Sequence, residues 1–343
     1  MAPAGQARIR SLSPQGARLA AAIMSEILRL ILPFFGVLFL GYGAGRLRRV
    51  SEEGLAGLAF FVTFLAMPSL FFRLVAEAPL TNAGGWTFVL TTTFSTYCAF
   101  AIAFSVGALT NGGQITQGTI QGLVGSYSNI AMLAPALVLP AFGAAAALPM
   151  ALVFSFDNAL VVATAPLMMT LGGTVRGDPA ELMQKIARQA LLNPLVIATV
   201  LGLVFALSGL HLPDAVDSVF AMLGGAAAPA ALFVVGVSLA GRTVDRLPPE
   251  LPVLIAIKLI AHPLIVYLLL SWVGDFDPVW VHAAVLMAAL PPATGVIAFA
   301  REYKSYGEWA TVGVLLGTVI SISTVTVVLI LLVSDILPVN PFH

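Results

Sequence analysis

Residues 78–156 read APLTNAGGWTFVLTTTFSTYCAFAIAFSVGALTNGGQITQGTIQGLVGSYSNIAMLAPALVLPAFGAAAALPMALVFSF. This stretch, which lies between Glu77 and Asp157, contains no Asp, Glu, Lys, Arg or His. Over the whole chain of 343 residues, 59% are apolar and 9% are charged, whereas an average soluble domain is about a quarter charged. So few charges cannot cover a water-exposed surface. The sequence therefore excludes a soluble globular protein and predicts that lipid surrounds most of the chain.

Net charge and cysteine content exclude further classes of protein. The 16 basic residues balance the 16 acidic residues, so the chain offers no electrostatic basis for binding nucleic acid. The single cysteine, Cys98, lies inside an apolar run and has no partner in the chain for a disulfide or a cysteine-rich metal site.

A helix needs about 20 mostly apolar residues to cross the hydrocarbon. Ten segments of the chain qualify, so we expect an all-α membrane protein with ten transmembrane helices. The segments are 27–45, 55–76, 85–109, 117–142, 146–171, 190–209, 215–240, 250–273, 278–300 and 308–334. Their continuous apolar character, without strict alternation, disfavours a transmembrane β-barrel.

Basic residues predict the orientation of these helices, because Lys and Arg concentrate in cytoplasmic loops. The loops after odd-numbered segments contain ten basic residues, and the loops after even-numbered segments contain none. The ten are Arg46, Arg48, Arg49, Arg176, Lys185, Arg188, Arg242, Arg246, Arg301 and Lys304. We therefore expect cytoplasmic odd loops and two termini on the opposite, periplasmic face of a bacterial inner membrane.

The N-terminal tail, residues 1–25, disagrees with this rule. Residues 1–23 carry Arg8, Arg10 and Arg18 and no acidic residue, yet the rule places them outside. A signal peptide is one interpretation, because the arginines precede an apolar stretch. The interpretation that we favour is that Met24 is the native start.

Three positions repeat at one shared offset, which indicates an internal duplication. Pro33, Gly41 and Pro68 in the first half each have a counterpart in the corresponding segment of the second half. The counterparts are Pro194, Gly202 and Pro229, and each number is larger by 161. Because each half would hold an odd number of helices, five, the second half enters the membrane from the other side. Such inverted repeats are typical of secondary transporters.

The fourth and ninth segments contain signals for broken helices. Residues 125–135 read GSYSNIAMLAP, and residues 290–295 read LPPATG. Polar clusters and prolines are unfavourable in lipid unless they line a cavity, and half-helix N-termini at such breaks attract anions. The candidate substrate ligands are Ser126, Ser128, Asn129, Pro135, Pro291, Pro292, Thr294 and Gly295. The alternative is a pair of ordinary proline kinks, with serines bonded to their own helix.

Four residues form a candidate group of buried charges. Asp157 and Lys258 lie within segments that belong to opposite halves, and each needs a partner in the membrane. Asn158 and His262 are their close neighbours in sequence. We expect Asp157 and Lys258 to pair, either as a fixed salt bridge or as a switch linked to a proton or another ion. His262 fits a packed, hydrogen-bonded histidine better than a proton relay.

Enzymatic motifs are missing from the sequence. It contains no H-E-x-x-H and no G-x-S-x-G, and the four histidines are scattered. We therefore expect a protein that is not an enzyme and that uses no metal or organic cofactor.

A series of short motifs resembles the auxin efflux carrier family of membrane transporters, over nearly the whole chain from Met24. Each motif is weak alone, but their order and spacing are fairly specific. The motifs are LGY at 40–42 with the basic cluster at 46–49, MPSLF at 67–71, GSYSN at 125–129, NPL at 193–195, APAALF at 228–233, Lys258 with Pro263, ALPPA at 289–293 and AREY at 300–303.

The resemblance implies ten helices in two inverted repeats of five, with crossed broken helices 4 and 9, in a fold similar to that of sodium/proton antiporters. It implies a scaffold domain of residues 26–76 and 190–241, which forms the dimer surface in relatives. A transport domain of residues 83–172 and 250–335 would move against this scaffold by alternating access.

The resemblance also implies a small organic anion as substrate, such as an auxin or a dicarboxylate like malonate or malate, with Asn129 at its carboxylate. The chain departs from the family at Thr294 and Gly295, where relatives often carry an Asn. Antiporters of similar fold carry an acidic pair or Asn-Asp where this chain has Asp157-Asn158. Whether a proton or a sodium ion is coupled to transport therefore stays an open question. The alternative function is a cation/proton antiporter or a sodium-coupled symporter that uses Asp157 as its ion ligand.

Overall fold

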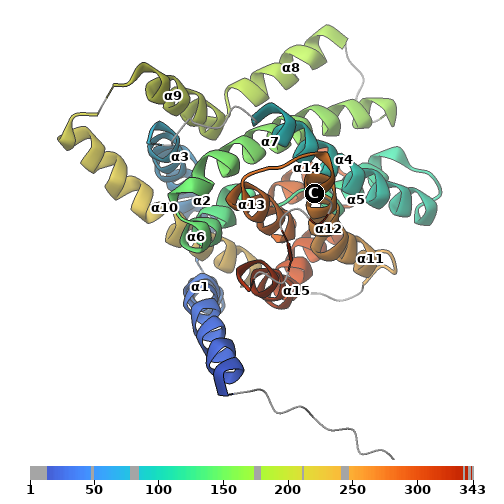
Figure 1. The fold of residues 1–343 in the computed structure, drawn as a ribbon. Coiled ribbons are helices and arrows are strands. Elements are labelled where there is room, and N and C mark those ends of the chain that lie inside the picture. Colours follow the sequence, from blue (N-terminus) through green and yellow to red (C-terminus); the bar gives the residue numbers. More distant parts are fainter. Residues whose placement is uncertain are drawn as a thin grey trace, which may run out of the picture.

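The computed structural model describes residues 14–47, 50–77, 85–173, 179–210, 212–240 and 247–334, together with 337, 338 and 341 (Figure 1). Side chains are described in these ranges except at 14–24, 26, 160 and 179. All regular elements in the described ranges are helices, and they pack into one bundle. An isolated antiparallel β-bridge joins Ser128 to Pro292.

The helices follow the chain in a simple order. In the first half they are α1 (Pro14–Leu47), α2 (Glu52–Phe61), the π-helix η1 (Val62–Ala66), α3 (Met67–Ala76), α4 (Gly85–Thr110), α5 (Ile115–Ser126), α6 (Ile130–Phe142), the 3₁₀ turn η2 (Ala144–Ala146) and α7 (Ala147–Leu171). In the second half they are α8 (Pro179–Leu191), α9 (Pro194–Ser208), α10 (Asp214–Ala240), α11 (Leu251–Ala256), the π-helix η3 (Ile257–Ala261), α12 (His262–Val273), α13 (Pro278–Ala289), α14 (Gly295–Glu302) and α15 (Gly307–Val333).

Seven stretches of the described chain are helical, long and apolar enough to cross a membrane. They coincide with the first, second, third, fifth, seventh, eighth and tenth predicted segments, and their bounds are Ile27–Leu47, Glu52–Ala76, Gly85–Thr110, Ala144–Leu171, Asp214–Ala240, Leu251–Val273 and Gly307–Val333. A bent pair, Ala180–Leu191 and Pro194–Ser208 at 59°, makes an eighth candidate. The fourth and ninth predicted segments are each divided into two shorter helices. The structure therefore supports an all-helical membrane protein with seven to eight candidate spans, and the count of ten stays a prediction.

Two helix boundaries differ from the sequence-based expectation. The first helix begins at Pro14, before the predicted start at residue 27, and residues 1–13 lie outside the described part of the chain. The helix α8 lies where the prediction had a loop. It is amphipathic, with Ile186 buried while Lys185 and Arg188 are exposed. Because it contains many polar and charged residues, a search for long apolar runs does not find it. Its apolar residues nevertheless recur with helical period.

Two π-helical turns precede prolines in long helices. The turn η1 leads into Met67-Pro68, and η3 leads into His262-Pro263. Because proline has no N–H, the regular hydrogen-bond ladder must adjust around it, and a π-bulge is one way to do so. The second bulge contains Lys258, and π-bulges are frequent at functional sites.

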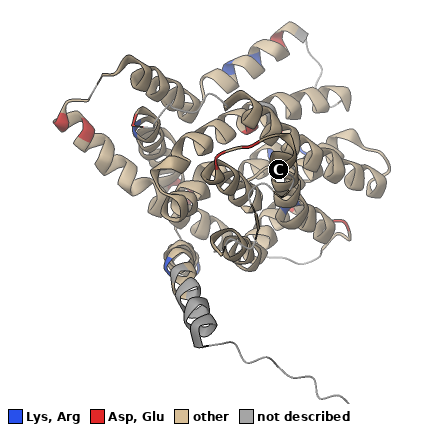
Figure 2. Cartoon of the chain, in the orientation of Figure 1, with Lys and Arg blue, Asp and Glu red and all other residues tan. Residues whose placement is uncertain are grey.

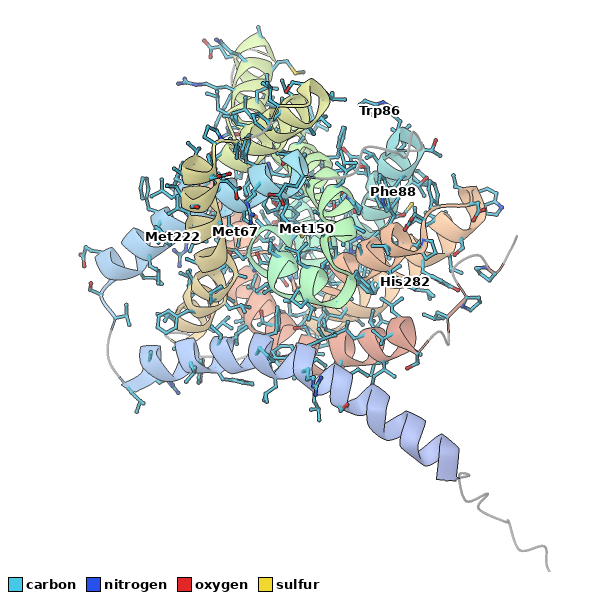
Figure 3. The ribbon with its side chains drawn as sticks, turned by 60° about the vertical axis from the view of Figure 1, so that its left-hand side comes forward. Met67, Trp86, Phe88, Met150, Met222 and His282 are labelled. Carbon is cyan, nitrogen blue, oxygen red and sulfur yellow. The ribbon has the colours of Figure 1, made fainter. Side chains whose placement is uncertain are left out.

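Charge is almost absent from the body of the bundle (Figure 2). Its interior is apolar: Met67, Phe88 and Met150 are at most 1% exposed, whereas Trp86 and Met222 are at least 70% exposed on the periphery (Figure 3). Large exposed apolar side chains are expected where the surrounding solvent is lipid. One buried cluster, which includes Leu123, Val124, Leu254 and Val296, draws all its members from the two parts of the predicted transport domain.

Two glycines make reciprocal contacts that obey the repeat found in the sequence. A Cβ atom on Gly41 of α1 would collide with the carbonyl oxygen of Phe233 on α10. A Cβ atom on Gly202 of α9 would lie 2.7 Å from the carbonyl oxygen of Phe72 in α3. The two glycines are separated by the same interval as the two phenylalanines, which is the offset of the repeat. The contact between the first and seventh segments is therefore repeated between the sixth and the second, as a two-fold relation requires.

We expect Gly41→Ala and Gly202→Ala each to lower the free energy of unfolding by about 1–3 kcal/mol, because the added methyl group overpacks a helix–helix contact. The measurement is thermal unfolding of the purified protein in detergent. Gly43→Ala is the matched control, since Gly43 has open space around it and an alanine there favours the helix. Equal melting temperatures for all three variants would contradict the close packing.

Candidate functional site

The fourth and ninth predicted segments break where they cross one another. The chain leaves helical geometry at Tyr127 after α5 and at Leu290 after α13. Asn129 N donates to Pro291 O at 3.0 Å, and Ala293 N donates to Tyr127 O at 2.9 Å. These two bonds flank the bridge between Ser128 and Pro292. Each break thus supplies hydrogen-bond partners that the other lacks, as unwound backbone inside a membrane protein requires.

Four helix ends meet at this crossing, two of each sign. The C-terminal ends of α5 and α13 carry partial negative charge, and the N-terminal ends of α6 and α14 carry partial positive charge. Lys258 Nζ donates to the carbonyl oxygen of Ala288 at 2.5 Å, in the last turn of α13. The ammonium group therefore offsets one negative end. In α6 the first regular bond runs from Leu133 N to Asn129 O, so the amides of Ala131 and Met132 precede the ladder and are available to an anion.

A chain of hydrogen bonds links Lys258 to Asp157. Lys258 Nζ lies 3.3 Å from His262 Nδ1, and His262 Nε2 lies 3.3 Å from Thr96 Oγ1. Thr96 Oγ1 lies 3.2 and 3.3 Å from the two carboxylate oxygens of Asp157. With Lys258 donating to Nδ1, the imidazole carries its proton on Nε2 and donates to Thr96, whose hydroxyl donates to Asp157. All four side chains are at most 3% exposed.

These hydrogen bonds differ from the direct ion pair between Asp157 and Lys258 that the sequence predicts. The salt bridges within 4.0 Å in the described part of the chain are Arg73 with Glu77, Arg73 with Asp217 and Lys185 with Glu302, and none joins Asp157 to Lys258. The expectation that the two charges meet across the halves holds only through Thr96 and His262. The reason is geometric, because Lys258 extends to the end of α13, and the imidazole of His262 and the hydroxyl of Thr96 bridge the rest of the way.

A small cavity adjoins this chain of residues. It is lined by Ser128 at the break and by residues of α4, α6, α7, α12 and α13, including Thr92, Thr96, Asp157 and His262, and has room for about one water molecule. Ser128 is 3% exposed, and its hydroxyl has no hydrogen-bond partner in the described structure. The cavity therefore connects the crossing to the carboxylate of Asp157.

The structure brings most of the predicted substrate ligands to the crossing. Ser128 and Pro292 form the bridge, Pro291 accepts from Asn129, and Gly295 begins α14. Asn129 and Thr294 occupy the N-cap positions of α6 and α14, where neither side chain makes a capping bond. Both side chains are thus not used to close their own helices.

Two predicted ligands are placed differently. Ser126 donates to Gly122 O at 2.9 Å, so its hydroxyl proton serves its own helix, as the alternative of back-bonded serines expects. Pro135 lies inside α6, which continues to Phe142. The break thus comes before Pro135, at the polar cluster.

Some residues of the site were not predicted as such. Thr92 and Thr96 lie one turn apart on α4 and both line the cavity, and a pair of threonines at this spacing within a charge-free segment was the available signal. Tyr127 donates its phenolic proton to Asn158 Oδ1 at 3.1 Å. Ala288 acts through its backbone, so no side-chain pattern could have identified it. No group of three His, Cys, Asp or Glu residues suited to a metal ion exists within the described ranges.

Comparison with known proteins identifies the family of this chain. Residues 178–329 match a family model described as "Membrane transport protein". A protein of Rhizobium meliloti (strain 1021), named "Putative malonate transporter", is 39% identical over 319 residues, which cover 93% of this chain and 100% of that protein. The chain belongs to the auxin efflux carrier family of membrane transporters.

A more distant relative is also named as a transporter. The "Uncharacterized transporter YfdV" of Escherichia coli (strain K12) is 23% identical over 292 residues, which cover 82% of this chain and 90% of that protein. The resemblance seen in the sequence motifs is therefore confirmed, and the protein is a membrane transporter and not an enzyme.

We expect Asp157→Asn and Lys258→Met to be non-additive in stability, because the chain through Thr96 and His262 joins them. The double variant should be less destabilised than the sum of the single variants, by about 0.5–3 kcal/mol. Thermal or denaturant unfolding of the four proteins of the cycle measures this difference.

Two controls make this cycle specific. Lys185→Met changes an exposed lysine that takes no part in the hydrogen bonds between Lys258 and Asp157. Its effect on stability should therefore add to that of Asp157→Asn. A Thr96→Val background removes the bridging hydroxyl and should reduce the coupling. Full additivity of Asp157→Asn with Lys258→Met would show that the two charges act independently.

Proposed function

We propose that this protein is a secondary active transporter that moves a small organic anion, of the dicarboxylate class represented by malonate, across the bacterial inner membrane. The observation that carries the proposal is the crossing of two broken helices. There the amides of Ala131 and Met132 and the side chains of Asn129 and Ser128 offer neutral donors to an anion. The name of the 39% identical Rhizobium meliloti relative supports malonate as the first substrate to test.

The proposed architecture is ten membrane crossings in two inverted repeats of five. The reciprocal contacts of Gly41 with Phe233 and of Gly202 with Phe72 support the two-fold relation. In this proposal residues 26–76 and 190–241 form the scaffold, and residues 83–172 and 250–335 form the transport domain. The buried cluster that includes Leu123, which draws on both parts of the transport domain and on no scaffold residue, supports a core shared by those two parts.

Alternating access follows from this division. The transport domain would shift against the scaffold, so that the crossing opens first to one side and then to the other. The exposed basic residues Arg46, Lys185, Arg188, Arg301 and Lys304 support a cytoplasmic side for the odd-numbered loops, and hence periplasmic termini. The exposed apolar residues of α1, such as Leu32 and Leu40, offer a scaffold surface for lipid or for a second copy in a homodimer.

We expect Asn129→Ala to weaken malonate binding at least about 10-fold, because a hydrogen bond to a charged group contributes about 1.5–3 kcal/mol. Isothermal titration of the purified protein gives the affinity directly, and a ligand-induced rise in melting temperature gives it independently. The matched control is Ser126→Ala, since that hydroxyl already donates to Gly122 O and should not contribute to binding. Unchanged affinity in the Asn129 variant would remove the crossing as the binding site.

Asp157 is the proposed coupling residue, for a proton or a sodium ion. Its carboxylate is 3% exposed and accepts from Thr96 in the cavity that also contains Ser128. An asparagine at this position cannot gain a proton and carries no negative charge to attract a cation. We expect Asp157→Asn to abolish the dependence of malonate uptake on a pH or sodium gradient in proteoliposomes, while malonate binding persists.

The same experiment separates the alternative function. A cation/proton antiporter would exchange sodium for protons in the absence of malonate, and Asp157→Asn would stop that exchange. If malonate uptake by the Asp157 variant follows the gradients as in the wild type, the coupling site lies elsewhere.

A further inference from the structure

Two neighbouring residues of α7 reach different parts of the site. Asp157 faces Thr96 and the cavity shared with Ser128 and His262, whereas Asn158 faces Tyr127. Successive residues of a helix point about 100° apart, so one helix can serve two subsites. The hydrogen bonds that link Lys258 to Asp157 do not include Asn158, so this residue has no role in them.

The Asn158 side chain has an unused donor in a buried position. It is 7% exposed, its oxygen accepts from the Tyr127 hydroxyl at 3.1 Å, and its nitrogen Nδ2 has no hydrogen-bond partner within the described structure. Buried amide groups are almost always paired on both sides, because an unpaired donor in a protein interior is unfavourable. Tyr127 thus holds this amide with its N–H₂ group free, which suits a ligand that accepts hydrogen bonds.

Tyr127, which holds this amide, also contacts a helix N-terminus. Its backbone oxygen accepts from Ala293 N, and its ring carbon Cε1 lies 3.6 Å from the position that a Cβ on Gly295 would occupy. Gly295 is the first residue of α14. The amides of Val296 and Ile297 are already bonded to Ala293 O and Thr294 O, so those of Thr294 and Gly295 are the outermost donors of the half-helix.

We propose that Asn158 donates directly to a carboxylate of the transported anion at the N-terminus of α14, and that Tyr127 is the residue that positions it. The inference rests on the proposed function, because it names a ligand group for the same anion. Neutral donors suit this place, since an amide and a helix N-terminus bind a carboxylate without a fixed cation that would hold it too firmly for release. Here Asn158 supplies from α7 a side-chain amide, a group that Thr294 and Gly295 do not provide.

Two variants of the full-length protein test this assignment by titration with malonate. Asn158→Asp keeps the oxygen that accepts from Tyr127, removes the N–H₂ donor and adds a negative charge. We expect its malonate affinity to fall at least about 30-fold. Tyr127→Phe removes one hydroxyl and keeps the ring against Gly295, so we expect a fall of about 3- to 10-fold. The control is Tyr97→Phe, which removes a phenol of α4 that is hydrogen-bonded to Thr164 of α7, the helix that carries Asn158, and should leave the affinity unchanged.

A second ligand distinguishes direct contact from a structural role. Malonamate, the monoamide of malonate, presents an N–H₂ group where malonate presents a carboxylate. If Asn158 touches the anion, Asn158→Asp should shift the ratio of malonate to malonamate affinity toward malonamate by about 10-fold or more. A structural defect would lower both affinities alike and would leave the ratio as in the wild type.

The outcomes separate this inference from the proposed function. Wild-type protein that binds neither malonate nor any other small carboxylate overturns both. Wild-type binding with unchanged malonate affinity in Tyr127→Phe and Asn158→Asp overturns the assignment of Asn158 alone, and so does an equal loss for both ligands. If Asn158→Asp does not fold, an affinity for Tyr127→Phe equal to that of Tyr97→Phe is sufficient to reject the positioning role.

Discussion

The structure depends on the requirement that every backbone polar group inside a membrane has a hydrogen-bond partner. Two segments of this chain cannot meet the requirement alone, because Pro291 and Pro292 remove donors and the residues from Tyr127 to Asn129 leave helical geometry. They meet it together, through Asn129 N to Pro291 O and Ala293 N to Tyr127 O. The crossing is therefore a consequence of backbone chemistry alone.

Once the crossing exists, the surrounding side chains follow from its electrostatics. An exposed carbonyl end of α13 needs a positive partner, and Lys258 supplies it at Ala288 O. A buried ammonium then needs further partners, which a histidine, a threonine and Asp157 provide in sequence. These buried charged residues are thus part of one continuous network that begins at a helix end.

Much of this arrangement could be predicted from the sequence. The positions of both breaks follow from a polar cluster and from consecutive prolines, and the internal repeat follows from prolines and glycines that share one offset. The sequence predicts a direct contact between Asp157 and Lys258, whereas the structure joins them through His262 and Thr96. The distance that a side chain must span depends on how the helices pack, which the sequence pattern does not give. The contact of Tyr127 with Asn158 joins two segments whose sequences contain no pattern that relates one residue to the other, so only the packed structure identifies it.

The amphipathic helix α8 and the course of α6 past Pro135 show the two limits of pattern reading. A search for long apolar runs misses an amphipathic helix, since its apolar residues occupy one side only. Proline alone also does not locate a break, because a helix in a membrane protein tolerates proline when neighbours satisfy the freed carbonyl. At Pro135 the helix continues, whereas at Pro291 and Pro292 it ends.

The bridge between Ser128 and Pro292 has a consequence for biosynthesis. Its two sides lie in opposite halves of the chain, and ribosomes deliver the N-terminal side first. Until the ninth segment is synthesised, Tyr127 O and Asn129 N lack the partners that they have in the folded structure. Water or the insertion machinery must satisfy these groups until the ninth segment arrives. The site is therefore completed late in synthesis, when the last helices of the chain join the bundle.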